Sequence, residues 1–266
     1  MKEIYHLKQP KGIGVPILIS VPHSGLFIPD KIRKVMNPLA IEDLDDADFY
    51  VDKLYDFALE MGMTMISATH HRWVIDLNRA PDNVKLYNDG RLATSLVPSY
   101  TFRGLSLYNK QVTGSDEIDH RLRTYYLPYH QQLNSILQEM KRTFGFALLW
   151  DAHSIRRHVP SINPSPFPDL ILGTNEGASV SSDFIDVVNS VLENCGHTLQ
   201  HNDPFKGGYI TRNYGDPQAN IHAIQLEMCK DLYLDEDERS LPKDIPEIRQ
   251  VLISTFEALI TKMKEL

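Results

Sequence analysis

The sequence of 266 residues contains little cysteine and no long hydrophobic run. Its two cysteines, Cys195 and Cys229, are too few for a disulfide framework, and no CxxC metal motif is present. No apolar stretch approaches the roughly 18 residues of a membrane-spanning helix. The N-terminus also lacks the basic and then apolar pattern of a signal peptide. These absences predict a protein of a reducing, cytoplasmic compartment that makes no membrane contact.

Basic residues are outnumbered by acidic ones, 27 against 35, which gives a formal net charge of -8. Because phosphate backbones are bound mainly by clustered Lys and Arg, no nucleic acid is expected as a partner. Hydrophobic residues make up 42% of the chain and charged residues 23%, values that exclude a disordered protein. Without an internal repeat or a linker-like stretch, residues 1–266 are expected to form one domain.

Short apolar runs alternate with longer amphipathic ones, which predicts an α/β fold with a mixed, mostly parallel central sheet flanked by helices. Gly145 is placed to end one helix in a left-handed conformation. We expect strands at residues 15–20, 64–67, 73–77, 146–150, 170–172, 198–201 and 221–228, and helices at 48–61, 118–142, 182–194 and 246–264.

Side chains that bind metals follow two of the expected strands. His23 comes after the first strand, while Asp151 and His153 follow the strand that begins at residue 146. Ligand sites of open α/β sheets lie beyond the carboxyl ends of the strands, so these segments could converge. Asp-x-His at a strand end is typical of a metal ligand, or of a ligand with an orienting carboxylate. Each motif alone also fits a structural role.

An acidic run at residues 42–48 supplies further carboxylates. Most of it is expected to be a solvated helix start, because carboxylates stabilise the positive N-terminal end of a helix. One member could instead complete a metal site. A catalytic zinc site takes three protein ligands and a water, and His23, His153 and one carboxylate would satisfy that number.

The run Asp-Leu-Asn-Arg at residues 76–79 could hold an anionic group. Arg79 offers a bidentate fork for a carboxylate and Asn78 adds an amide donor. The alternative is a structural ion pair between Arg79 and Asp76 or Asp82.

A lone charge, Glu227, lies within the apolar strand expected at residues 221–228. A buried carboxylate is costly unless it is paired or functional, so Glu227 is either part of a structural ion pair or a general base. Before it, the pair Gly207 and Gly208 indicates a backbone that must approach another group closely.

Taken in order, these segments resemble the N-formylglutamate amidohydrolase family, over about residues 15 to 235. The resemblance implies a fold similar to the zinc carboxypeptidases and aspartoacylases, which is called phosphorylase/hydrolase-like. The matching motifs are Val-Pro-His-Ser-Gly at 21–25, Asp48 with Val-Asp-Lys-Leu at 51–54, Arg72 with Asp-Leu-Asn-Arg at 76–79, Asp-Ala-His-Ser at 151–154, Leu-Gly at 172–173, Gly-Gly-Tyr-Ile-Thr-Arg at 207–212 and Gln-Leu-Glu at 225–227.

The resemblance implies one catalytic Zn²⁺ bound by His23 and His153. The wider superfamily has a metal-binding glutamate three residues after the first histidine, and Leu26 occupies that position here. Asp48 is therefore expected as the third ligand, with Asp46 and Asp151 as alternatives.

The resemblance also implies roles for five other residues. Glu227 is expected to act as general base and Arg72 to polarise the substrate carbonyl. Asn78 and Arg79 are expected to bind one substrate carboxylate, with Arg212 on a second one.

The implied reaction is hydrolysis of N-formyl-L-glutamate to formate and L-glutamate, a step of histidine degradation. The expected partner is thus a small dicarboxylate substrate. Two alternatives stay open at this point. One is the release of a different acyl group from an acidic amino acid or a small peptide. The other is a non-catalytic protein that binds an acidic metabolite.

Overall fold

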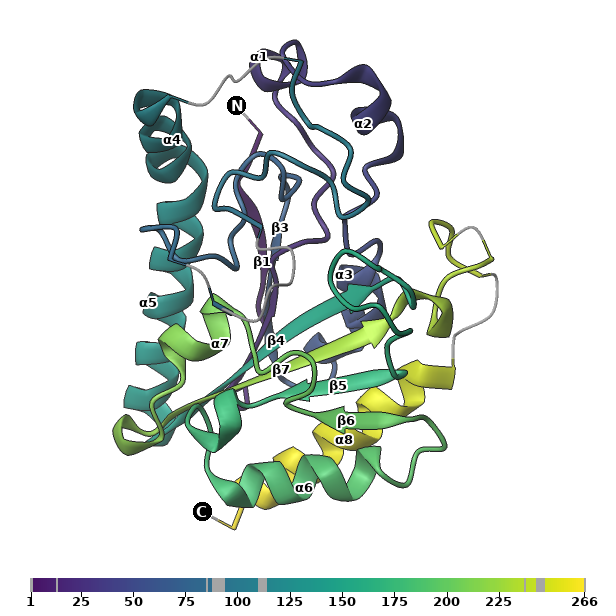
Figure 1. The fold of residues 1–266 in the computed structure, drawn as a ribbon. Helices are drawn as coiled ribbons and strands as arrows, with labels where there is room; N and C mark the ends of the chain where they lie inside the picture. The colour runs from purple at the N-terminus through teal and green to yellow at the C-terminus, as the bar shows by residue number, and fades with distance from the viewer. Residues whose placement is uncertain are drawn as a thin grey trace.

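The computed structural model describes residues 2–12, 14–84, 86–87, 94–109, 114–236, 238–242 and 247–265. Its described strands form one seven-stranded sheet (Figure 1). Neighbouring strands are parallel except at two places, β1 with β3 and β5 with β7, which confirms the mixed, mostly parallel sheet. In sheet order the strands are β1 (Tyr5–Lys8), β3 (Thr64–Ala68), β2 (Ile17–Val21), β4 (Ala147–Ile155), β7 (Ile221–Cys229), β5 (Leu170–Gly173) and β6 (Leu199–His201).

Helices cover both faces of the sheet (Figure 1). On one face, Leu148 and Trp150 of β4 pack in a core with residues of α3 (Val51–Leu54), α6 (Ser182–Leu192) and α8 (Glu247–Met263). On the other face, Leu149 packs with residues of α5 (Leu127–Phe144) and α7 (Tyr209–Tyr214). Since side chains alternate along a strand, Asp151 and His153 belong to the face covered by α5 and α7.

The long amphipathic segment predicted at residues 118–142 is helical over a wider range. It consists of α4 (Ser115–Arg121), a π-helical turn at Leu122–Tyr126 and α5, and Gly145 ends it at a φ of 87°, as expected. The π turn lies directly before Leu127 and Pro128, and proline removes a backbone donor from the regular helical ladder. The turn places the Tyr126 hydroxyl 2.8 Å from the Arg79 carbonyl, to which it donates.

The prediction of a strand at residues 73–77 is wrong. This run is apolar and buried, as a strand in a parallel sheet would be, but its backbone bonds locally and to a loop: Val74 N donates to His71 O and Asp76 N to Leu96 O. The side chain of His130 on α5 adds a donor, because its Nε2 lies 2.9 Å from the Leu77 carbonyl.

Other boundaries also differ from the predictions. The helix expected at residues 48–61 is shorter, since α3 gives way to a 3₁₀ turn at Asp56–Leu59. Strand β1 and helix α7 were not predicted; β1 is a short, half-exposed edge strand without a clear apolar pattern. Two short helices, α1 (Asp30–Arg33) and α2 (Pro38–Asp43), lie between β2 and α3. In the described part of the chain, no helix combines the length and apolar character needed to cross a bilayer.

The buried His130 ring predicts how stability depends on pH. Burial lowers the pKa of His130 to about 4 from an unfolded value near 6.5. The neutral ring therefore contributes stability that is complete above pH 6.5 and is lost as the pH falls toward 4, by up to about 3 kcal/mol. Urea unfolding between pH 4 and pH 7 should show this loss in the wild type and a smaller loss in His130→Gln.

The exposed His120 provides the matched control. His120→Gln should keep the wild-type dependence on pH. If His130→Gln and the wild type lose equal stability between pH 6.5 and 4, His130 is not the responsible group.

Candidate functional site: a His, Asp and His cluster at the carboxyl edge of the sheet

The site forms where β4 and β7 end side by side. The two strands are parallel, and their register sets His153 opposite Glu227 and Asp151 opposite Gln225. His23 follows β2, the other neighbour of β4, by two residues. One pocket at this edge is lined by seven of the eight predicted site residues: His23, Asp48, Arg72, Asn78, Arg79, His153 and Glu227.

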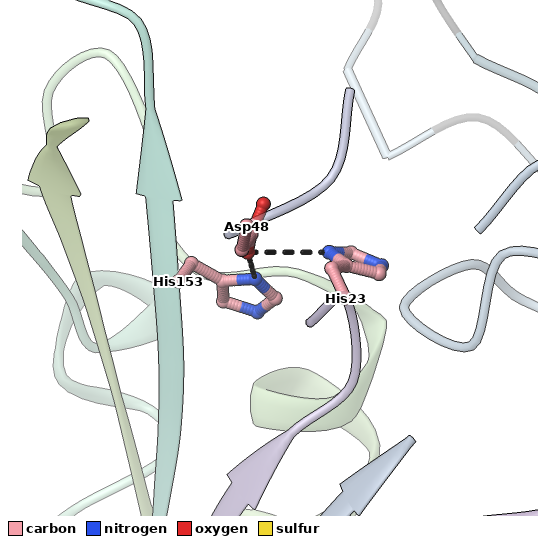
Figure 2. A group of neighbouring side chains, drawn as sticks. All are labelled: His23, Asp48 and His153. Atoms are coloured by element: carbon pink, nitrogen blue, oxygen red, sulfur yellow. Dashed lines mark hydrogen bonds and ion pairs between the residues drawn. The ribbon is translucent and has the colours of Figure 1, made fainter. Parts of the chain in front are cut away.

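His23, Asp48 and His153 are buried and converge on one point (Figure 2). One potential ligand atom from each lies within 4.8 Å of the others. Asp48 Oδ2 is 3.1 Å from His153 Nδ1 and 3.7 Å from His23 Nδ1. Two imidazole nitrogens and one carboxylate oxygen form a donor set that suits Zn²⁺, with a coordination position left for water.

The far nitrogen of each imidazole is held by a second carboxylate. His23 Nε2 donates to Asp76 Oδ1 at 2.8 Å, and His153 Nε2 lies 3.1 Å from Asp151 Oδ2. For His23, a proton held on Nε2 by Asp76 leaves the Nδ1 lone pair available, which is the usual arrangement around a metal-binding histidine. His23 Nδ1 is buried and has no hydrogen-bond partner, so its lone pair could coordinate a metal ion.

The electrostatics of the cluster also suit a cation. Burial opposes ionisation of the Asp48 carboxyl. The imidazoles of His153 and His23 nevertheless hold its pKa well below the usual range. Burial likewise opposes a charge on His153, but Asp151 and Asp48 raise its pKa well above the ordinary value. The carboxylates therefore favour a positive charge at this position, which a proton or a metal ion can supply.

The structure brings Asp48 to both histidines, unlike the two alternative carboxylates. Asp46 accepts instead from Trp73 Nε1 at 2.7 Å and from the Phe102 amide. Asp151 lies on the far side of the His153 ring, where it orients the ring. Asp48 as the third metal ligand stays a prediction, now with a geometry that fits it.

Glu227 points a carboxylate into the same pocket. It is partly buried, and among the described residues it has no hydrogen-bond or ion-pair partner, so the structural ion pair considered for it finds no partner here. Burial raises the pKa of the Glu227 carboxyl to about 8. A carboxylate with a raised pKa beside a reacting water is suited to accept and return a proton.

Two arginines in the pocket are fixed by their surroundings. The Arg72 guanidinium is buried, donates from one terminal nitrogen to Asp76 Oδ2 at 2.7 Å and lies over the Phe102 ring. Arg79 donates through Nε to the hydroxyl of Thr94 at 2.8 Å and through a terminal nitrogen to the Asn78 carbonyl. Each guanidinium keeps N–H groups for a ligand.

Asn78 is bound on both sides of its amide group. Its Oδ1 accepts from the Ile210 amide at 2.7 Å, and its Nδ2 lies 2.8 Å from His153 Nε2 and 3.1 Å from Asp151 Oδ2. A Cβ on Gly208 would collide with this amide. Position 208 therefore needs glycine because the Asn78 side chain lies against its backbone, the kind of close approach that the glycine pair predicted. Asn78 thus contacts the cluster itself besides lining the pocket.

Arg212 is the one predicted site residue outside the pocket lining. It contacts two residues of that lining: its Nε donates to the Gly207 carbonyl at 2.8 Å, and its guanidinium lies over the Tyr87 ring. One of its terminal nitrogens is buried without a hydrogen-bond partner.

Sequence analysis missed the role of Asp76 as the link between His23 and Arg72. The only signal was a buried carboxylate directly after an apolar run, a pattern that a structural salt bridge also produces. It also missed the apolar wall of the pocket, which no local motif marks. That wall includes Val84, Phe102, Ile155, Ile162 and Phe205.

The fold and the site indicate the class, a hydrolytic enzyme built on a mixed α/β sheet, whose pocket combines a candidate metal site with an unpaired carboxylate and a fixed arginine. Comparison with known proteins identifies the family within this class. The sequence model of the N-formylglutamate amidohydrolase family matches residues 15–234. The chain belongs to the N-formylglutamate amidohydrolase family, as its motifs indicated.

Relatives and a solved structure agree with this assignment. The chain is 39% identical over 242 residues to an N-formylglutamate deformylase of Pseudomonas putida, with 90% of each chain covered. It is equally similar over 243 residues to the N-formylglutamate deformylase of Pseudomonas aeruginosa, with 89% of this chain and 87% of the relative covered. The crystal structure of an N-formylglutamate amidohydrolase from Ralstonia eutropha JMP134 superposes with a TM-score of 0.83 at 25% identity, over 97% of this chain and 98% of the other.

The contacts of Asp76 predict its effect on metal binding. Asp76→Asn weakens the acceptor that orients His23, and loss of such a partner typically lowers metal affinity about 10- to 100-fold. Competition with a chromophoric chelator measures this affinity without reference to turnover. Asp46→Asn is the control, because Asp46 contacts Trp73 and Phe102 and neither histidine. Equal zinc affinity in Asp76→Asn and the wild type would contradict the prediction.

Proposed function

We propose that this protein hydrolyses the amide bond of N-formyl-L-glutamate and releases formate and L-glutamate. The observation that carries the proposal is the partnerless Glu227 carboxylate in one pocket with the His23, Asp48 and His153 cluster. An amidohydrolase needs a site for an activated water and a base beside it, and this pocket supplies both. The names of the relatives at 39% identity support formylglutamate as the substrate.

We propose that His23, Asp48 and His153 hold one Zn²⁺. When bound, Zn²⁺ would lower the pKa of a water toward about 7 and polarise the formyl oxygen. The unpartnered His23 Nδ1 and the negative charge around His153 support a divalent cation at this point.

Glu227 acts first as general base and then as general acid. Its carboxylate takes a proton from the attacking water and then delivers one to the nitrogen of the leaving amine. The raised pKa of Glu227 favours this return, since the protonated form is accessible near neutral pH.

Arg72 stabilises the negative charge that develops on the formyl oxygen during attack. Its guanidinium is held in place by Asp76 before the substrate arrives, so little reorganisation accompanies the reaction. Loss of a donor of this kind typically costs about 3 to 4 kcal/mol of transition-state stabilisation.

Arg79 binds a carboxylate of the substrate, and Asn78, whose amide nitrogen is directed at Asp151 and His153, lines the pocket beside it. Thr94 and the Asn78 carbonyl fix the Arg79 guanidinium and leave N–H groups on its terminal nitrogens free. Arg212, which contacts the lining residues Gly207 and Tyr87 and has a buried terminal nitrogen that lacks a partner, is proposed for the second carboxylate.

The first test of this function is formate release from N-formyl-L-glutamate, with zinc-loaded and chelator-stripped protein compared in parallel. We expect release by the loaded protein and its loss on stripping, with recovery when zinc is added back. N-acetyl- and N-succinyl-L-glutamate test the acyl group. Release of another acyl group without formate would reassign the substrate, and zinc binding without any turnover would contradict the reaction.

Glu227→Gln tests the base. The substitution removes the proton acceptor but keeps the size of the side chain, so turnover should fall about 100- to 10,000-fold while zinc remains bound. Initial rates and metal content of the same preparation provide the measurement. Glu176→Gln is the control, because Glu176 is an exposed carboxylate paired with Lys206. Near-normal turnover in Glu227→Gln would exclude the assignment.

A further inference from the structure

A second cavity of about 300 Å³ adjoins the pocket. The two share the wall residues Phe102, Ser154 and Ile155, and Ser154 directly follows the candidate ligand His153. The reaction as derived above makes no use of this cavity.

Lys230, at the end of β7, lines the second cavity and is only 2% exposed. Its Nζ donates to the Asp45 carbonyl at 3.1 Å and lies over the Phe49 ring. Within the described ranges, no carboxylate oxygen lies within 4.0 Å of this Nζ, and the Asp45 carbonyl is its one hydrogen-bond acceptor. An ammonium has three donors, so two of them remain for a ligand.

The carboxylates that line the cavity are already engaged by other groups. Asp45 pairs with Arg156 at 2.5 Å and with Arg103 at 2.8 Å, and Glu238 also pairs with Arg156. Asp46 accepts from Trp73 and Phe102, as described above.

No lining carboxylate therefore contacts the Lys230 ammonium, although Asp48, Asp45 and Asp46 favour its charge from beyond contact distance. A buried ammonium without a contacting counter-ion carries a desolvation cost, which these more distant charges offset only in part. Burial accordingly lowers the pKa of Lys230 to about 8, which still leaves most of the side chain charged at pH 7. An anion in the cavity would remove this cost.

We propose that the second cavity is an anion subsite in which Lys230 binds a carboxylate. Its position beyond the shared wall suggests two sources for that group, both resting on the proposed function. One is the formate product, held next to the reaction centre as it leaves. The other is the distal carboxylate of the substrate, which would then bind to Lys230 in place of Arg212.

The first experiment measures formate binding to metal-stripped protein by calorimetry, which requires no turnover. Lys230→Met removes the charge and keeps an apolar stem over Phe49, and Lys230→Gln also keeps a donor for the Asp45 carbonyl. Lys262→Met, on the distant helix α8, is the control with the same change in charge. If formate is the ligand, its affinity should fall at least 10-fold in both Lys230 variants and stay at the wild-type value in the control.

The second experiment compares KM for N-formyl-L-glutamate and N-formyl-L-glutamine, which lacks the distal charge, in zinc-loaded protein. If the distal carboxylate is the ligand, the Lys230 variants should raise KM about 10-fold for the glutamate substrate alone. Unchanged formate affinity together with an unchanged ratio of the two KM values would overturn the proposal.

The unfolding midpoint of each variant shows whether it is folded. If Lys230→Met does not fold, Lys230→Gln alone is used for both measurements. A wild type that binds formate but releases none from any substrate would count against the proposed function and leave the subsite in place.

Discussion

The site depends on the requirement that carboxylates removed from water find partners. Asp48, Asp76 and Asp151 are all buried, and each one meets an imidazole of His23 or His153. Desolvation of an unpaired carboxylate would cost more than a domain of this size can tolerate at several positions. His153 is therefore held at both ring nitrogens and His23 at Nε2, so the nitrogens that face Asp48 are oriented before any ligand binds.

Glu227 is the exception among the carboxylates of the site. It lies opposite His153 in the register of β4 and β7, within the same pocket, but no imidazole or guanidinium of the described residues pairs with it. The environments of two nearby carboxylates thus shift their pKa values in opposite directions, downward for Asp48 and upward for Glu227. Such a separation distinguishes a group that stays ionised as a ligand from one that exchanges a proton.

The parts of the fold that the sequence predicted are those in which local pattern and tertiary environment agree. Strands β2, β4 and β7 are buried along almost their whole length and are rich in apolar residues, so the sequence predicts them as strands and places the residues at their carboxyl ends in one crevice. The run at residues 73–77 has the same composition, but local turns and a loop satisfy its backbone. Composition alone does not distinguish the two cases.

Site residues that depend on contacts between distant segments were harder to predict. The role of Asp76 becomes clear only from the structure, in which His23 and Arg72 bind its two carboxylate oxygens. Lys230 looks in sequence like an ordinary residue after a strand, and only the cavity and the absence of a carboxylate in contact with its ammonium distinguish it. Arg212 contacts Gly207 and Tyr87 of the pocket lining, and its assignment to a substrate carboxylate stays a prediction.

Asp76 also couples two proposed functions mechanically. One of its oxygens holds His23 and the other holds Arg72, so a single rigid carboxylate sets the distance between a candidate metal ligand and the proposed oxyanion donor. Burial would raise the pKa of Asp76, but Arg72 and His23 keep it well below its usual range, and the anchor stays ionised. The same ion pair allows a guanidinium to stay buried and charged in the pocket. A chain of net charge -8 thereby keeps a local positive charge for the proposed anionic substrate. Asp76 binds one terminal nitrogen of Arg72, so the other N–H groups of this guanidinium are available for the oxygen that it is proposed to stabilise.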